Sequence, residues 1–72
     1  MRKNVIVIVM NNGLSDGEYR ERLSLLWNIC RKFNFDVHGY SSVFVGSDGL
    51  NLEMFLAFLE AHGLKYYVEV LE

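Results

Sequence analysis

The hydrophobic and polar positions along the chain predict two successive strand-helix-strand units. The first begins with Val5–Met10, an unbroken and mostly β-branched run that is too short for a helix and ends at the turn sequence Asn11-Asn12-Gly13. We expect this run to be a central strand covered on both faces. Ser15 and Glu18 have the spacing of a capping box, so a helix should begin there.

This first helix is predicted to be amphipathic and to end at Asn34. Its apolar residues recur at helical spacing, and charged or polar residues lie between them. Leu25 and Ile29 widen the apolar arc beyond what one sheet face needs, which suggests a second contact. The residues predicted to face the core are Tyr19, Leu23, Leu26, Trp27, Cys30 and Phe33.

The second unit starts with two strands. The segment from Phe35 to Tyr40 alternates apolar and polar residues, the pattern of a half-exposed edge strand. Val43–Val45 follows after only two serines and is the third predicted strand. At the end of the chain, Lys65–Glu72 alternates again and is the fourth.

A second helix is expected from Leu50 to His62, capped by Ser47 or Asn51 and stopped by Gly63. It is apolar nearly all round, apart from a ridge of two glutamates. Helices of this kind rarely face water over their whole outer surface. We therefore expect part of this helix to contact another surface.

The predicted order is strand, helix, strand, strand, helix, strand, and the triplet Ser15-Asp16-Gly17 recurs as Ser47-Asp48-Gly49 at the matching point of the second unit. Right-handed crossovers would interleave two such units into one sheet. The prediction is a single α+β domain over residues 1–72 with a ferredoxin-like fold: a four-stranded antiparallel sheet with two helices on one face.

The sheet face without helices is predicted to be an interface. It should carry either Ile6, Ile8 and Met10 or the alternate set Val5, Val7 and Val9, and in both cases it is too apolar for a solvated surface. Together with the second helix, it gives a predicted protein-partner interface. The residues assigned to it are Ile6, Ile8, Met10, Tyr40, Phe44, Met54, Phe58 and Tyr67.

Composition narrows the possible partners and the compartment. The chain has 72 residues, a formal net charge of −2 and no run of five or more like charges, so its charge does not indicate nucleic-acid binding, although it does not exclude it. The single cysteine cannot form an internal disulfide, and the apolar stretch before Asn11 is too short for a signal peptide or a membrane span. We expect a cytoplasmic protein, with no membrane partner, that gains stability from self-association.

Candidate chemistry is sparse. Asp36 and His38 share one face of a predicted strand, but a metal site needs three or four convergent ligands. Cys30 lies on an apolar stripe, where a buried and inert thiol is expected. The Asn11-Asn12-Gly13 turn could bind an anion, although Asp16 and Glu18 would repel a phosphate. We assign no catalytic, cofactor-binding or metal-binding residue.

The segment from Asn34 to Gly46, with Ser42-Val43-Phe44 at its centre, resembles the small CRISPR spacer-acquisition proteins and their relatives, the virulence-associated protein D ribonucleases. That resemblance implies a ferredoxin-like dimer that binds or cuts nucleic acid. It also implies a metal-binding aspartate after the first strand, where this chain has Met10-Asn11-Asn12, and an amide is a poor ligand for a hard cation.

A second resemblance is to ACT-type amino-acid-sensing domains. It rests on the strand followed by an Asn-Gly-Leu turn, on Phe35-Asp36-Val37, and on the Leu59–Leu64 segment before the last strand. This resemblance implies a small-molecule sensor whose first turn touches a ligand at a dimer interface. Both families imply a ferredoxin-like dimer.

The leading hypothesis is a non-enzymatic protein-interaction module, homodimeric, that serves as a small regulator or inhibitor of a larger complex of phage or bacterial origin. The motivating observations are the excess of apolar residues and the absence of recognisable catalytic motifs. Two alternatives stay open: a divergent spacer-acquisition-like or virulence-associated-protein-D-like nucleic-acid-binding protein or metal-dependent ribonuclease, and an ACT-like sensor.

Overall fold

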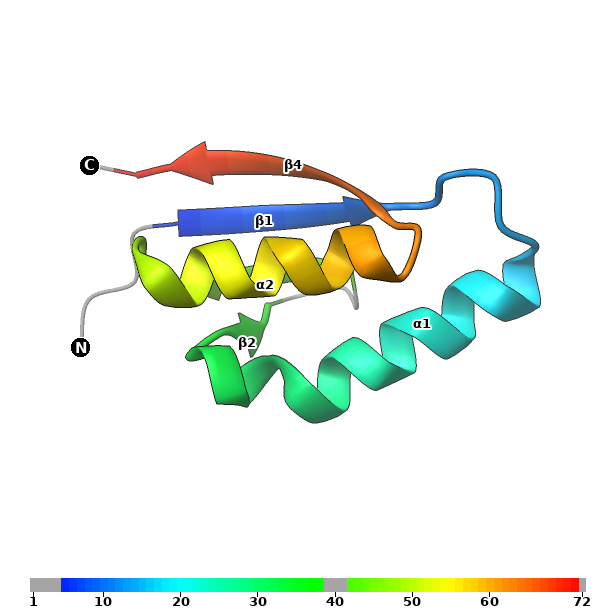
Figure 1. Ribbon diagram of the computed structural model, residues 1–72, viewed down its shortest axis with the longest axis horizontal. Coiled ribbons are helices and arrows are strands. Elements are labelled where there is room, and N and C mark those ends of the chain that lie inside the picture. The colour runs from blue at the N-terminus through cyan, green and yellow to red at the C-terminus, as the bar shows by residue number, and fades with distance from the viewer. Residues whose placement is uncertain (1–4, 39–41, 72) are drawn as a thin grey trace.

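The structure is a computed structural model that describes residues 5–38 and 42–71. Its elements follow the predicted order of strands and helices (Figure 1). They are β1 (Val5–Met10), α1 (Asp16–Ile29), the 3₁₀ helix η1 (Cys30–Phe33), β2 (Asp36–Val37), β3 (Val43–Gly46), α2 (Leu50–Ala61) and β4 (Lys65–Val70).

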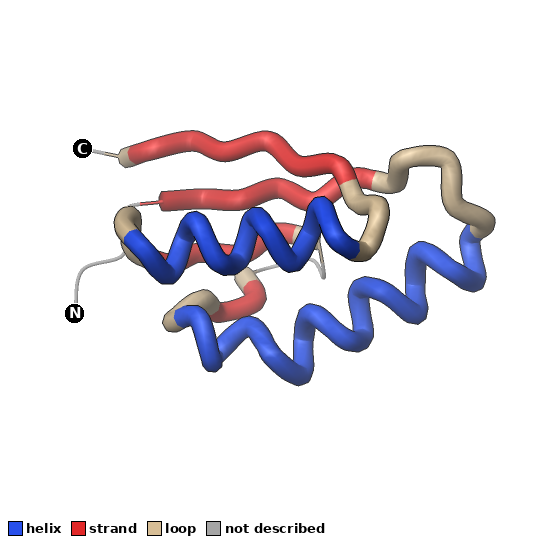
Figure 2. The backbone as a smooth tube through the Cα atoms, viewed as in Figure 1, coloured by secondary structure: helices blue, strands red, loops and turns tan. Residues whose placement is uncertain are grey.

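The four strands form one antiparallel sheet in the order β2-β3-β1-β4, with β1 in the interior as predicted. The register places Ile8 of β1 between Val43 of β3 and Tyr67 of β4. Both helices lie on the same side of this sheet (Figure 2). This arrangement confirms the predicted ferredoxin-like α+β fold.

Strand β1 is covered on one face only, so the expectation of cover on both faces is wrong. Val5, Val7 and Val9 are buried beneath the helices, whereas Ile6 and Ile8 alternate with them on the opposite face and are only partly buried. Crossovers of the same hand place both helices on one side, so in the described part of the chain no helix covers the other side of the sheet.

Helix α1 begins with the predicted capping box. The backbone N–H of Glu18 donates to Ser15 Oγ at 3.3 Å, and the backbone N–H of Ser15 donates to Glu18 Oε1 at 3.2 Å. The Tyr19 hydroxyl then donates to the carbonyl oxygen of Val9 at 3.1 Å, which ties the first turn of α1 to the end of β1.

Replacing Ser15 by alanine is expected to lower the free energy of unfolding by about 1 kcal/mol, because it removes the acceptor for one N–H of the first turn. Urea denaturation followed by circular dichroism measures the change. Ser24→Ala, on the exposed side of the same helix, is the matched control and should change stability by less than about 0.5 kcal/mol. Equal losses in the two variants would contradict the capping role.

The buried stripe of α1 and η1 is narrower than the sequence pattern predicts. Leu23, Leu26 and Cys30 are buried, but Trp27 is 43% exposed, so its predicted core position is wrong. Trp27 lies one position beyond Leu26, which turns its side chain by about 100° around the helix, away from the sheet. Asn34 closes η1 in the left-handed conformation, with φ of 59°, as predicted for the end of this segment.

Helix α2 starts and stops close to the predicted bounds, but its cap differs. Gly49 occupies the N-cap position and no side chain caps the helix, so the predicted caps Ser47 and Asn51 are wrong. Asp48 Oδ1 accepts a hydrogen bond from the Gly49 N–H at 2.8 Å instead. Gly63 adopts φ of 72° after the helix, the left-handed conformation that makes glycine suitable as a stop.

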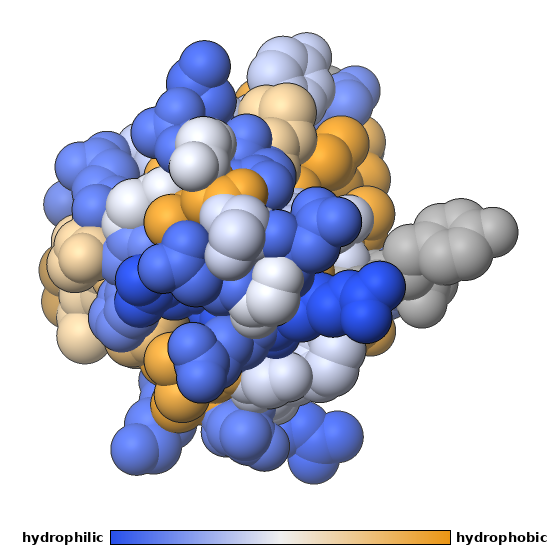
Figure 3. Space-filling view, turned by 90° about the vertical axis from the view of Figure 1, so that its right-hand side faces the viewer, coloured by the Kyte–Doolittle hydropathy of each residue, from blue (hydrophilic) through white to orange (hydrophobic). Residues whose placement is uncertain are grey.

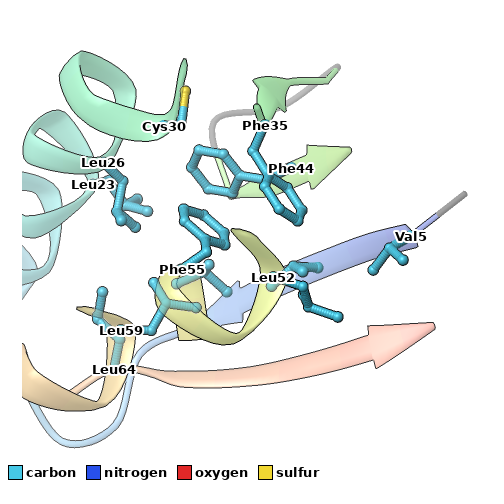
Figure 4. Close-up of a cluster of buried hydrophobic side chains, with 12 residues drawn as sticks. Val5, Leu23, Leu26, Cys30, Phe35, Phe44, Leu52, Phe55, Leu59 and Leu64 are labelled. Atoms are coloured by element: carbon cyan, nitrogen blue, oxygen red, sulfur yellow. The ribbon is translucent and has the colours of Figure 1, made fainter. Parts of the chain in front are cut away.

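The core is centred on Phe55 of α2 (Figure 4). Its ring stacks on Phe35 with a centroid separation of 4.6 Å and meets Phe44 edge-on at 5.3 Å. Phe44 is fully buried on the helix side of the sheet, so it presents no surface to a partner, and its predicted interface role is corrected. Phe33 completes the cluster at 5.8 Å from Phe55.

Strand β2 is shorter than expected. It spans Asp36–Val37 instead of the whole alternating segment, and Phe35 before it is drawn into the core. The predicted interface residue Tyr40 lies outside the described residues.

Within residues 5–38 and 42–71, no helix has the length and apolar character needed to cross a membrane.

Candidate functional site

The most prominent surface feature is the helix-free side of the sheet, which we term the open sheet face. Directly paired residues on neighbouring strands point to the same side, so the register defines its members. Ile6 is paired with Val45, and Ile8 is paired with both Val43 and Tyr67. The apolar members are Ile6, Ile8 and Met10 of β1, Val43 and Val45 of β3, and Tyr67 of β4.

These side chains form a continuous apolar surface. Met10 is 41% exposed and Tyr67 is 55% exposed, and the other members are partly buried. Paired side chains on antiparallel strands lie about 5 Å apart, so the surface has no polar gap between β3 and β4. A contiguous apolar patch of this kind on a folded chain is typical of a contact surface.

Among the described residues, the charged and polar side chains of the open sheet face lie around its rim. Asp36 on β2 is paired with Val45, and His38 follows at the same edge, where its backbone N–H donates to the Val43 carbonyl oxygen at 2.8 Å. On the opposite edge, Glu69 is paired with Ile6 and Lys65 is paired with Met10. An apolar centre with a charged rim is the usual anatomy of a protein–protein interface.

A second apolar surface runs along the outside of α2. Leu50, Met54, Ala57 and Ala61 recur at helical spacing and are all exposed, Leu50 by 71%. We term this set the outer α2 stripe. Glu53 and Glu60 flank it on one side. Glu60 is held in place because its Oε2 accepts a hydrogen bond from the Tyr66 hydroxyl at 2.6 Å, which also raises the pKa of Tyr66.

The predicted interface residues therefore separate into distinct places. Ile6, Ile8, Met10 and Tyr67 come together on the open sheet face. Met54 lies on the far side of the molecule in the outer α2 stripe. Phe58 is partly buried beside that stripe, where its ring stacks on His62 at 4.0 Å and lies 6.4 Å from Phe33.

Sequence reasoning missed six residues of the open sheet face, two in its apolar centre and four on its rim, of which Asp36 and His38 were weighed only as metal ligands. Val43 and Val45 belong to its apolar centre, and Lys65 and Glu69 form its β4 rim. Their alternation with Phe44, Tyr66 and Val68 was visible in the sequence, but only the register with β1 shows which alternate set shares the face of Ile8.

Cys30 is buried at the end of α1, and its thiol donates to the carbonyl oxygen of Trp27 at 3.6 Å. Burial raises the pKa of this thiol, and the negative charge of Asp36 raises it further. The Cys30 thiol is therefore protonated at neutral pH, whereas the reactive form of a cysteine is the thiolate.

The polar groups of the turn after β1 form hydrogen bonds within the turn itself. Asn11 Nδ2 donates to the carbonyl oxygen of Leu14 at 2.8 Å, and Asn11 Oδ1 accepts from the Leu14 N–H at 2.8 Å. The Glu18 carboxylate already accepts from Ser15 at the helix start, where an anion would have to bind. Figure 3 views this end of the molecule, and its surface is mostly hydrophilic.

Asp36 and His38 do not gain further ligands in the fold. In the described part of the chain, no three histidine, cysteine, aspartate or glutamate side chains converge as a metal site would need, and no pocket is present. Sites for small molecules are usually concave, so the described residues offer flat surfaces and turns where such a site would need a cavity.

Comparison with known proteins finds no match: no family model, no curated protein and no solved structure matches the chain.

Proposed function

We propose that this chain is a non-enzymatic protein-interaction module that pairs with a second copy of itself through the open sheet face. The observation that carries the proposal is the continuous apolar surface of β3, β1 and β4, which the two helices leave uncovered. Burying such a surface against another removes apolar area from water, the main driving force for association.

The size of the surface sets the expected strength of the dimer. Strands lie about 4.8 Å apart and rise about 3.3 Å per residue, so the open sheet face offers at most roughly 400 Å² per copy. Stable interfaces bury about 800 Å² per partner, so this dimer falls in the weak class. We expect a dissociation constant on the order of 1–100 µM.

The outer α2 stripe is exposed on the helix layer, on the side of the sheet opposite the open sheet face, and would stay accessible in such a dimer. We propose that it binds a protein partner, which makes the dimer a small cytoplasmic regulator or inhibitor of a larger complex. Leu50 and Met54 would be its apolar anchors, with Glu53 and Glu60 favouring a partner that carries basic residues beside its contact surface.

Replacing Ile8 by aspartate tests the self-association. Ile8 lies at the centre of the open sheet face, so the substitution would bury two uncompensated carboxylates in the dimer. Sedimentation equilibrium should show a dissociation constant at least tenfold above that of the unsubstituted chain. Met54→Asp places the same charge in the outer α2 stripe and should leave the dimer unchanged.

Circular dichroism shows whether each variant is folded. We expect Ile8→Asp to fold, because Ile8 is only partly buried and the aspartate can reach water in the monomer. A chain that is monomeric at millimolar concentration before substitution would contradict the proposed function. A dimer lost in Met54→Asp but kept in Ile8→Asp would place the self-contact on α2 and contradict the role of the sheet.

The alternatives share the same fold, and fold alone does not choose among them. A nucleic-acid-cutting relative of the spacer-acquisition proteins would show magnesium-dependent cleavage that depends on Asn12. Asn11 is the poorer choice for this test, because both polar atoms of its amide serve the turn to Leu14. An ACT-like sensor would show a rise in melting temperature with an amino acid.

A further inference from the structure

The rim charges of the open sheet face distinguish between the two ways in which two copies can stack. A face-to-face pair related by a two-fold axis has that axis in the plane between the sheets. When the strands of the two sheets pack nearly aligned, the axis runs close to the strand direction or close to perpendicular to it. The two orientations bring different rim residues of the second copy opposite Lys65 and Glu69.

An axis along the strands keeps equivalent strand ends together and exchanges the two edges of the sheet. Residues paired across neighbouring strands form a row, which we name after its β1 residue. Asp36 and Glu69 both lie in the row of Ile6, at opposite edges of the sheet. Each Glu69 would then face Asp36 of the second copy, and the contact would occur twice. Like charges brought together at an interface cost affinity.

An axis across the strands reverses the strand direction and lays β4 over β4 of the second copy. With the axis through the row of Ile8 and Tyr67, the row of Met10 faces the row of Ile6. Lys65 then lies opposite Glu69 of the second copy, and the symmetry repeats this ion pair at the other end. Ile8 and Tyr67 each meet their own equivalents in the apolar centre.

From this charge pattern we infer that the open sheet face binds a second copy of this chain in the strand-antiparallel orientation, held in register by two Lys65–Glu69 ion pairs between the copies. The inference rests on the proposed function and adds to it the geometry of the dimer. Within one chain, Lys65 and Glu69 are four residues apart along β4, about 13 Å, which is too far for an ion pair between them.

Mixing two charge-reversal variants tests the orientation. In Lys65→Glu alone, or in Glu69→Lys alone, both ion pairs of the dimer become like-charge contacts. We expect the dissociation constant of each to rise about tenfold, as for two weak exposed ion pairs lost together. When the two variants are mixed, the new carboxylate at position 65 faces the new ammonium at position 69, and a heterodimer should form with the original affinity.

A matched pair on the helix layer, one residue in α1 and one in η1, controls for net charge. Lys32→Glu and Glu21→Lys change the charge of the chain by the same amounts, at exposed positions on the helix layer. Neither variant alone nor their mixture should alter the dissociation constant by more than about twofold. One variant is uniformly isotope-labelled so that native mass spectrometry separates the heterodimer from both homodimers, and sedimentation equilibrium gives the affinities.

The outcomes separate this inference from the proposed function. An unsubstituted chain that does not dimerise overturns both. A dimer that Glu69→Lys strengthens overturns the orientation only, because that result indicates relief of the contact with Asp36. A dimer that survives Ile8→Asp but responds to the rim variants overturns the face-to-face stack, since it indicates edge pairing of β4 with β4, where Ile8 stays in water.

Discussion

Replacing Phe55 by alanine is expected to lower the free energy of unfolding by about 3–5 kcal/mol. Phe55 is fully buried and its ring contacts Phe33, Phe35 and Phe44, which come from η1, the segment before β2, and β3. Its loss would leave a cavity between the helix layer and the sheet. A chain of 72 residues has a total stability of about 4–11 kcal/mol, so the variant would lose a large part of it.

Urea denaturation at a fixed protein concentration measures this loss, since dimerisation also adds to apparent stability. Phe55→Leu is the matched control: it keeps much of the apolar volume and should cost about half as much or less. The melting temperature of Phe55→Ala should fall by more than about 12 °C. A loss below about 1 kcal/mol would show that the aromatic cluster is not the centre of the core.

Replacing Gly46 by alanine is expected to cost about 3 kcal/mol, at the upper end for an overpacked core. A Cβ at this position would lie 2.6 Å from Cγ and Cδ2 of Phe35, inside van der Waals contact. Phe35 is fully buried and stacked on Phe55, so its ring has no free space into which it can move. The glycine at the end of β3 is therefore required by the close approach of this ring.

Gly17→Ala provides the contrast, with the same chemical change at the start of α1. A Cβ there meets no atom within 4 Å, and alanine is the better helix former, so the variant should gain about 0.5–1 kcal/mol. Denaturant midpoints of the two variants should move in opposite directions. A stabilised Gly46→Ala would show that Phe35 is mobile in the core.

Several local features could be predicted from sequence because their physical cause is local. The β-branched run of β1, the capping box of Ser15 and Glu18, and the stop at Gly63 all depend on residues within one turn or one strand. The caps predicted for α2 were wrong because Ser47 and Asn51 each offered a plausible acceptor, and only the path of the chain out of β3 put Gly49 at that position.

The candidate site could be predicted only in part, because the apolar excess is visible in the sequence but the side to which each residue points is set by distant contacts. The excess of apolar residues indicated an uncovered surface, and Ile6, Ile8, Met10 and Tyr67 lie on one. Phe44 was assigned to it wrongly because an aromatic residue on a short strand has no local feature that shows which side it faces. The core aromatics around Phe55 decide that side, and they are distant in sequence.

The sequence by itself determined the order of strands and helices, and thereby the fold, because hydrophobic periodicity and turn residues act over short distances along the chain. Only the tertiary structure decided which face of β1 is open. Both alternate sets of β1 are apolar, so the pattern is nearly symmetric, and a one-residue difference in register would exchange them. The antiparallel pairing with β3 and β4, together with two helices on one side, breaks that symmetry: it buries Val5, Val7 and Val9 and leaves Ile6, Ile8 and Met10 to form the surface from which the proposed function follows.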